Sequence, residues 1–175
     1  MKLVIVGYMA SGKSIIANKL SEMNGFLHLD LDDYIEEKEK QTIAKIFETK
    51  GEIYFRKVEN RYLKELLTSD KEFVLSVGGG TPCYADNIKI IQKHAISFYL
   101  KASIVTIYDR LQQEKSKRPL VRNISNSDLK EFIAKHLFER RTFYEKANHQ
   151  IVVDNKSINE IVAEINYSKN AMDCF

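Results

Sequence analysis

The sequence predicts an α/β protein built on a parallel β-sheet that helices cover on both faces. Segments with strand character and segments with helical periodicity alternate along the chain, and no internal repeat or low-complexity linker interrupts them. Apolar runs such as 3–6 and 73–77 are hydrophobic at nearly every position, which is typical of strands buried on both sides. The first run also leads directly into a glycine-rich loop and a helix. Together these patterns indicate a three-layer α/β/α architecture.

Length and composition indicate one globular domain, spanning 1–175. The chain has 175 residues, of which 44% are hydrophobic and 29% charged, so it can bury a substantial core. The net charge is +3 with basic residues spread along the chain, which favours small anionic ligands over a nucleic-acid surface. No apolar run approaches the ~18 residues of a membrane span. Cys83 and Cys174 form no metal or disulfide framework, which favours a reducing compartment, the cytoplasm.

The glycine-rich loop at 7–14 has the pattern G-x-x-x-x-G-K-S of a phosphate-binding loop. Its glycines let successive backbone N–H groups point inward, and the N-terminus of the next helix adds a dipole that favours anions. Lys13 would then reach the β- and γ-phosphates of a nucleotide, and the Ser14 hydroxyl would bind Mg²⁺. The alternative is a glycine turn that matches by chance. The flanking strand and helix disfavour it. The apolar residues at helical spacing after the loop are Ile16, Leu20 and Met23.

The second predicted strand, at 26–30, brings acidic residues to the carboxyl end of the sheet, where ligands bind in open α/β folds. If this strand continued to Asp32, the carboxylates of Asp30 and Asp32 would share a face. One could then support Mg²⁺ through water while the other deprotonates an attacking hydroxyl. Alternatively, the aspartates form a polar cap on the next helix, where carboxylates suit the dipole. Spacing alone leaves both interpretations open.

Helical patterns follow the second strand. Two short helices are predicted over 34–49, broken near 41–42, and a longer amphipathic segment begins at Gly51. In that segment Arg56 and Glu59 fall outside the apolar stripe.

The third predicted strand, at 73–77, ends in three consecutive glycines, 78–80. Glycines at a strand end permit positive φ and let a ligand approach the backbone closely. Thr81 and Pro82 then fit the N-cap and first position of a helix over 84–94.

The last part of the chain continues the alternation and carries several arginines. Arg56, Arg118, Arg122, Arg140 and Arg141 could each bind a carboxylate or phosphate through a bidentate fork, although most arginines are simply solvated. The remaining predicted elements are a strand at 95–100, a helix at 103–113, a mobile basic loop at 115–123, a long helix through 129–144, a strand at 150–153 and a last helix opened by the capping box Ser157-x-x-Glu160.

Six motifs, in this order, resemble those of the shikimate kinase family, and the likeness runs from Lys2 to about Val162. Any one of them is weak, whereas the ordered set is specific. The motifs are the loop ending in Gly12-Lys13-Ser14, then Asp30-x-Asp32, Gly51-Glu52-x-x-Phe55-Arg56-x-x-Glu59, Gly78-Gly79-Gly80, Arg118-Pro119-Leu120 and Arg140-x-x-x-Tyr144.

The resemblance implies a P-loop kinase fold with a five-stranded parallel sheet in the order 2-3-1-4-5 and a mobile lid at about 112–124. It also implies an activity: ATP-dependent phosphorylation of the 3-hydroxyl of shikimate, giving shikimate 3-phosphate and ADP in aromatic amino acid biosynthesis. The expected partners are the small molecules ATP and shikimate, with Mg²⁺ as cofactor. The chain is expected to be a monomer without nucleic-acid or membrane partners.

The resemblance also assigns roles to individual residues. Asp32 would be the base, Lys13 and Arg118 would stabilise the transferring charge, and Mg²⁺ would bind Ser14 directly and Asp30 through water. The expected ATP contacts are Ala10, Ser11, Gly12, Lys13, Ser14, Ile15, Arg110 and Arg118. The expected shikimate contacts are Asp32, Arg56, Gly78, Gly79, Gly80 and Arg140.

The chain departs from the family at two positions of the phosphate-binding loop. Ala10 stands where glycine is usual, which bears on the local φ, and Ile15 replaces a hydroxyl residue that would bond the α-phosphate. Alternative functions are a kinase of another small polyol acid, such as gluconate, a kinase of a nucleoside monophosphate, or a P-loop switch protein. A GTP-dependent switch would carry N-K-x-D, and the sequence has no such tetrapeptide.

Overall fold

The computed structural model describes residues 1–114, 121 and 124–172. Its five strands form one parallel sheet in the order β2-β3-β1-β4-β5, which confirms the predicted architecture and strand order. The strands are β1 (Lys2–Val6), β2 (Leu27–Asp30), β3 (Phe73–Ser76), β4 (Ile96–Lys101) and β5 (His149–Val152).

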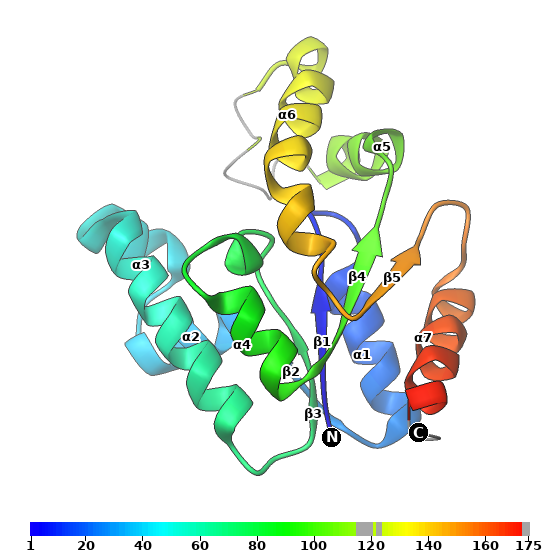
Figure 1. Ribbon diagram of the computed structural model, residues 1–175. Coiled ribbons are helices and arrows are strands. Elements are labelled where there is room, and N and C mark those ends of the chain that lie inside the picture. Colours follow the sequence, from blue (N-terminus) through cyan, green and yellow to red (C-terminus); the bar gives the residue numbers. More distant parts are fainter. Residues whose placement is uncertain (115–120, 122–123, 173–175) are drawn as a thin grey trace.

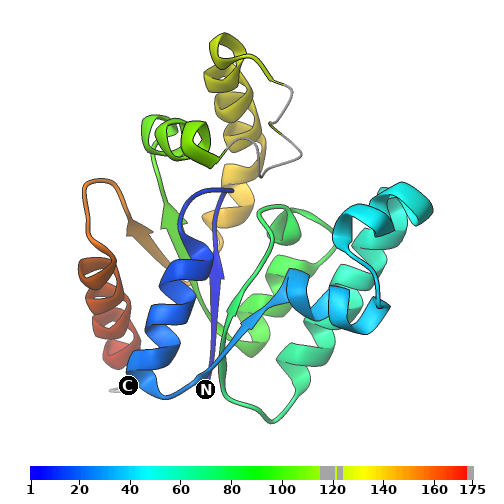
Figure 2. The same ribbon diagram turned by 180° about the vertical axis from the view of Figure 1, so that it is seen from behind.

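Helices lie on both faces of this sheet and at its carboxyl edge (Figure 1). The view from behind shows α1 in front of the sheet with α7 beside it, while α3 and α4 cover the opposite face (Figure 2). The pair α5 and α6 stands above the ends of the strands. The helices are α1 (Lys13–Asn24), α2 (Leu31–Glu39), α3 (Ile43–Thr68), the 3₁₀ turn η1 (Thr81–Cys83), α4 (Asn87–His94), α5 (Ile104–Glu114), α6 (Asn126–Tyr144) and α7 (Ile158–Met172).

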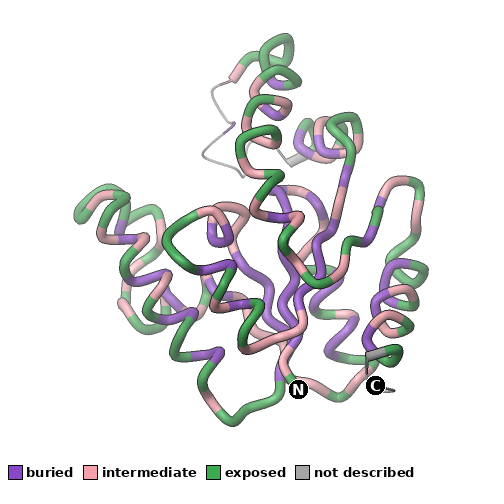
Figure 3. The backbone as a smooth tube through the Cα atoms, in the orientation of Figure 1, coloured by how far each residue is buried: buried purple, intermediate pink, exposed green. Residues whose placement is uncertain are grey.

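The core follows the central strands: β3 is buried at every position, and β1 at every position after Lys2 (Figure 3). Residues Leu3 to Val6 of β1 are fully buried because both faces of the strand are covered, which explains their uninterrupted apolar run. In the parallel register Asp30, at the end of β2, pairs with Ser76, at the end of β3. The loops that follow these strands therefore leave the sheet at the same edge, and this brings together segments far apart in the sequence.

The helices between β2 and β3 are divided where the sequence predicts, although α2 begins at Leu31 and not at 34. Thr42 caps the start of α3, and its hydroxyl accepts a hydrogen bond from the backbone N–H of Lys45. The predicted break near 41–42 is thereby confirmed. Within α3 the backbone leaves helical geometry at Gly51, at φ 78° and ψ 174°. This kink separates the short first part of α3 from the long amphipathic segment, as the sequence predicted, because glycine adopts such a φ without steric cost.

One local prediction is wrong. Thr81 is not a helix N-cap: it opens the short turn η1, and α4 begins only at Asn87. The Thr81 hydroxyl instead donates to the buried carboxylate of Glu59, at 2.6 Å, so a tertiary partner displaces the local cap. The second strand stops at the residue predicted, so Asp30 and Asp32 do not share a face of one strand. It ends at Asp30, whose carboxylate caps α2 by accepting from the Asp32 N–H at 2.9 Å.

The predicted lid, 112–124, falls largely outside the described residues. Helix α5 runs to Glu114, Val121 is buried, and residues 115–120 and 122–123 are not described. Arg118 and Arg122 are among them, so the lid and the role of Arg118 stay predictions. Within the part of the chain that the structure describes, no helix combines the length and apolarity needed to span a bilayer.

Candidate active site

The phosphate-binding loop joins β1 to α1 at the carboxyl edge of the sheet. A Cβ on Gly7 would lie 2.8 Å from the Ser11 hydroxyl and 3.0 Å from the carbonyl oxygen of Leu100, so only glycine fits there. Gly12 caps α1 with φ 99°, which glycine alone adopts easily. The Ser11 Oγ is buried and finds no hydrogen-bond partner among the described residues. A buried hydroxyl at a helix N-terminus, with curled backbone around it, suits an anionic ligand.

Ala10 adopts the left-handed conformation, at φ 59°. The loop thus keeps the backbone shape that a glycine would take, and a single methyl group bears the strain. Ile15, the second departure from the family pattern, is 60% exposed and can offer no hydroxyl.

Lys13, Ser14 and Asp30 lie together at the mouth of the loop. The Lys13 ammonium donates to the carbonyl oxygen of Tyr8 at 2.9 Å, which folds the side chain back over the loop. The Ser14 hydroxyl lies 3.4 Å from Asp30 Oδ2, which also accepts from the Ser76 hydroxyl at 2.6 Å. Of the two interpretations that the sequence left open for Asp30, the helix cap is observed through one oxygen, while the other oxygen faces Ser14 and leaves the Mg²⁺ role a prediction. A hydroxyl beside a carboxylate is a set of hard oxygen donors that fits Mg²⁺.

A cavity of about 500 Å³ opens next to the loop. Arg110, from α5, borders it and donates from Nη1 to the carbonyl oxygen of Ala10 at 3.1 Å. Basic side chains and isoleucines both line this space, which suits phosphates joined to a flat, apolar base. The lining residues are Ala10, Ser11, Gly12, Lys13, Ser14, Ile15, Ile16, Arg110, Gln113, Lys156, Ile158 and Ile161.

Asp32 lies in the first turn of α2 and faces the glycine segment after β3. A Cβ on Gly78 would come within 3.4 Å of its carboxylate, so the backbone of Gly78 lies against Asp32. Burial raises the pKa of Asp32 from 3.8 to about 7, the negative charges of Asp30 and Glu59 add to the rise, and Lys13 opposes it. A carboxylate whose pKa is near neutral is suited to exchange a proton during catalysis.

Arg56 extends from α3 to the same glycine segment. A Cβ on Gly80 would lie 3.0 Å from Arg56 Nη2, so a side chain there would displace the guanidinium. Arg56 Nη1 donates to Glu59 at 2.9 Å, and the Glu59 side chain is only 1% exposed. Glu59 is therefore part of the site, although from the sequence it was only placed in the motif with Arg56 and given no role of its own. Its spacing of three residues from Arg56 was the available signal.

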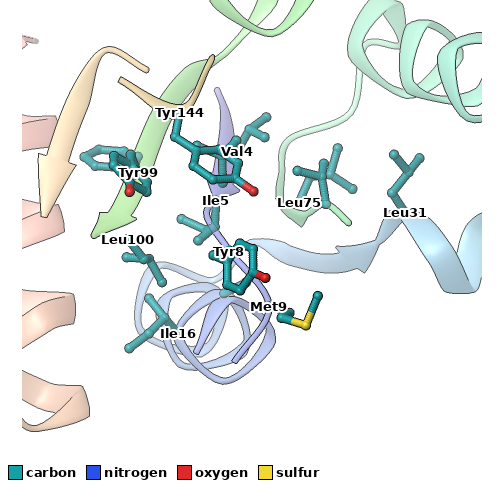
Figure 4. Close-up of a cluster of buried hydrophobic side chains, with 14 of the residues drawn as sticks. Val4, Ile5, Tyr8, Met9, Ile16, Leu31, Leu75, Tyr99, Leu100 and Tyr144 are labelled. Atoms are coloured by element: carbon teal, nitrogen blue, oxygen red, sulfur yellow. The ribbon is translucent and has the colours of Figure 1, made fainter. Parts of the chain in front are cut away.

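Helix α6 completes the site from above the sheet. Its Tyr144 hydroxyl donates to the carbonyl oxygen of Gly79 at 2.5 Å, which ties the helix to the glycine segment. The Arg140 guanidinium lies 6.0 Å from the ring centroid of Tyr8, in the phosphate-binding loop. Both tyrosine rings belong to the buried cluster around β1 (Figure 4). Burial raises the pKa of the nearby Cys83 thiol to about 11, against the opposing charges of Arg140 and Arg56.

The structure thus brings two of the predicted shikimate contacts, Asp32 and Arg56, to the glycine segment 78–80. Asp32 contacts it from α2, Arg56 from α3 and Tyr144 from α6, while the phosphate-binding loop approaches from β1: a Cβ on Gly79 would lie 3.3 Å from the backbone nitrogen of Met9. Arg118 lies outside the described residues. Among the described residues, no three His, Cys, Asp or Glu side chains form a metal cluster. A metal here would therefore depend on Ser14 and Asp30 together with the phosphates of a bound nucleotide.

A parallel sheet in this order, with a phosphate-binding loop after its first strand and a carboxylate and guanidinium facing that loop, defines a P-loop kinase of a small molecule. The model of the shikimate kinase family matches residues 9–168. A shikimate kinase of Flavobacterium johnsoniae is 50% identical over 165 residues, covering 94% of this chain and 96% of that protein. The chain belongs to the shikimate kinase family.

Solved structures agree with this assignment. A shikimate kinase from Bacteroides thetaiotaomicron superimposes with a TM-score of 0.90 at 27% identity, covering 97% of this chain and 98% of that one. A shikimate kinase from Acinetobacter baumannii, solved in complex with shikimate, superimposes with a TM-score of 0.86 at 29% identity. This comparison covers 97% of this chain and 93% of the other.

Proposed function

We propose that this chain transfers the γ-phosphoryl group of ATP to the 3-hydroxyl of shikimate, giving shikimate 3-phosphate and ADP. Membership of the shikimate kinase family supports the reaction. The observation in the structure that carries it is the position of Asp32, a carboxylate with a pKa near 7, between the Lys13 side and the Arg56 side of one site. A kinase needs that arrangement because it must align a hydroxyl with a phosphoryl group.

The phosphate-binding loop and the residues around it would hold ATP. The backbone N–H groups of 10–15 would cradle the phosphates, and Lys13 would turn from the Tyr8 carbonyl to the β- and γ-phosphates. Arg110, on the border of the cavity, would pack against the adenine. The hydroxyl of Ser14 and, through water, the carboxylate of Asp30 would hold Mg²⁺, which when bound neutralises charge on the β- and γ-phosphates.

The guanidinium groups of Arg56 and Arg140 would hold the carboxylate of shikimate. A guanidinium presents paired N–H groups in a plane that matches a carboxylate, which fixes orientation as well as position. The backbone of 78–80 would line the ring of the substrate, because its glycines carry no side chain to keep the ring away. Held in this way, the 3-hydroxyl would face Asp32 and the loop.

Asp32 would act as the base. As the hydroxyl oxygen bonds to the γ-phosphorus and the bond to the β-phosphate oxygen breaks, the hydroxyl proton passes to the Asp32 carboxylate and ADP leaves. Lys13 would stabilise charge on the transferring group, and Arg118 would do so from the lid. Closing that lid would exclude water as a competing acceptor.

The test is to incubate the protein with ATP and Mg²⁺ and to measure ADP formed with shikimate, gluconate or a nucleoside monophosphate as the acceptor. Of the three acceptors, we expect only shikimate to give rapid turnover. NMR of the product should show the phosphate on the 3-hydroxyl. Turnover with gluconate or a nucleoside monophosphate in its place would assign the chain to another acceptor. ATP hydrolysis unaffected by any acceptor would instead favour a switch protein.

We also propose that the chain works as a cytoplasmic monomer with Mg²⁺, ATP and shikimate as its partners. The sequence has only two cysteines, in no disulfide or metal-binding pattern, which supports a reducing compartment. The mild net charge of +3 supports small anionic ligands. Sedimentation of the purified protein would test the monomer, and a dimer at micromolar concentration would contradict it.

A further inference from the structure

The Arg56 guanidinium has an aromatic neighbour that neither the sequence motifs nor the family comparison assigns. Its Cζ lies 3.8 Å from the ring centroid of Tyr84, the residue directly after η1. This is a close cation–π contact, well within the ~6 Å over which such contacts attract. Since the backbone of Gly80 also lies against the guanidinium, Arg56 is held between the two ends of a single short segment, 80–84.

Tyr84 also acts on Arg56 through a second residue. Its hydroxyl donates to Glu52 Oε1 at 2.9 Å, and the same oxygen accepts from Arg56 Nε at 3.4 Å and from Nη2 at 3.3 Å. The Glu52 side chain is 53% exposed, and an exposed ion pair alone would hold its geometry weakly. The tyrosine hydroxyl gives this carboxylate a further anchor.

The hydrogen bonds leave part of the guanidinium available. A guanidinium has five N–H groups. Among the described residues, Glu52 engages Nε and one N–H of Nη2, and Glu59 engages one N–H of Nη1. One N–H on each terminal nitrogen remains, which is the number that a carboxylate uses in a bidentate pair.

We propose that Tyr84, together with Glu52, is a positioning residue that fixes the orientation in which Arg56 presents its two remaining N–H groups to the acid substrate. The ring of Tyr84 sets the plane of the guanidinium, and its hydroxyl holds Glu52 on the Nε side. This inference rests on the proposed role of Arg56 in binding the carboxylate. It assigns the specificity for an acid to a five-part cluster of Glu52, Arg56, Glu59, Gly80 and Tyr84.

Tyr84 is suited to this test because it contributes little to the core. The residue is 36% exposed, and it belongs to a short connection between η1 and α4. Removing it should therefore disturb substrate binding more than folding. Tyr167, on α7, is a matched control, since it is 79% exposed and lies on a helix far along the chain from the site.

The experiment measures KM for shikimate, KM for ATP and kcat in Tyr84→Phe, Tyr84→Ala, Glu52→Gln and the control Tyr167→Ala. We expect Tyr84→Ala to raise KM for shikimate by about 5-fold, the upper scale of a partly exposed cation–π contact. Tyr84→Phe keeps the ring and should raise it by only ~2–3-fold, the worth of one surface hydrogen bond. KM for ATP and kcat should change by less than about twofold, and the thermal midpoint by less than a few degrees. The control Tyr167→Ala should match the parent protein in every measurement.

A double-mutant cycle with Arg56→Lys separates positioning from general damage. If Tyr84 acts through the guanidinium, Tyr84→Ala should add little to KM once Arg56 is lysine, because the planar group that it supports is gone. Fully additive effects, or equal rises in both KM values, would overturn the inference. If Arg56→Lys changes KM for shikimate while Tyr84→Ala does not, Arg56 binds the carboxylate as proposed but Tyr84 does not position it. If Arg56→Lys has no effect, the proposed carboxylate site itself is wrong.

Discussion

The phosphate side and the acid side of this site are built in different ways. The proposed phosphate side comes from one continuous stretch, 7–14, at the start of α1, and would bind mainly through backbone N–H groups. The proposed acid side takes Asp32 from α2 and Arg56 from α3, which both lie against the glycine segment, and Arg140 from α6, which lies beside the Tyr8 ring. A continuous backbone cradle depends on local conformation alone, whereas separate side chains must each be aimed by their neighbours.

This difference explains why the supporting residues gather on the acid side. Glu59 is almost completely buried between Arg56 and Thr81, and Tyr144 joins α6 to Gly79. The positions of Ser14 and Lys13, by contrast, are set directly by the backbone conformation of the loop. We therefore expect substitutions on the acid side to act on shikimate, and those in the loop to act on ATP.

The largest effect is expected where the two sides meet, at Asp32. Asp32→Asn removes the base while keeping the size and hydrogen-bonding shape of the side chain, so kcat should fall by about 10³-fold or more. The affinity for ATP, measured by calorimetry, should stay within about twofold of the parent, because no phosphate contact is lost. Normal turnover in this variant would remove Asp32 from the mechanism.

Arg56→Ala should produce the next largest effect and should separate the two sides. Losing a bidentate carboxylate contact should raise KM for shikimate by roughly 10–100-fold, with KM for ATP unchanged. Arg61→Ala is the matched control, since Arg61 lies on the same helix but its side chain is 59% exposed and pairs with Glu39. Equal rises in both KM values would contradict the division into two sides.

Arg56→Ala also leaves Glu59 buried without its cation, which costs about 3–5 kcal/mol when such a pair is broken. Thermal unfolding must therefore accompany the kinetics, and Arg56→Lys, which keeps a positive charge, serves as the second variant.

The pH dependence follows from the raised pKa of Asp32. A base must be ionised to accept the proton, so kcat/KM for shikimate should rise about tenfold per pH unit up to about 7 and then level off. Carbon-13 NMR of aspartate carboxyls in the ligand-free protein should show one group titrating near 7 that is missing from Asp32→Asn. If every carboxyl titrates below pH 5, Asp32 is not the base at neutral pH.

The same group should lower the stability of the fold at alkaline pH. Its folded pKa, about 7, lies above the unfolded value of 3.8, so ionisation in the folded state costs free energy that grows between these pH values and is full above 7. Asp32→Asn should therefore unfold at least about 3 °C higher than the parent at pH 8. At pH 3.5 the two midpoints should converge. An advantage independent of pH would mean that the carboxylate is not the cause.

The smallest effect is expected from Ala10→Gly in the loop. Glycine relieves roughly 1–2 kcal/mol of left-handed strain but adds up to about 1 kcal/mol of freedom to the unfolded chain, so the midpoint should rise by only ~1–3 °C. Ala85, exposed at φ 48°, offers a matched control. Ala85→Gly should give a similar gain in stability, while Ala10→Gly alone should alter KM for ATP.

The amino-acid sequence by itself determined the parallel sheet, its covered strands and the phosphate-binding loop. Those features depend on residues close together in the chain: apolar runs, glycines at 7 and 12, and Lys13 beside Ser14. The break at Gly51 was likewise predictable, because a single residue type supplies the conformation.

Only the tertiary structure decided how the acid side is assembled. Asp30 could be a cap or a metal-side carboxylate, and packing of β2 against β3 allows it both roles through its two oxygens. The sequence predicted Thr81 as a local helix cap, but its hydroxyl donates to Glu59, which belongs to another helix. The reason is physical: a hydrogen bond between residues distant in the sequence forms only when the sheet brings their elements together. A local sequence pattern therefore cannot indicate which partner such a side chain will bond.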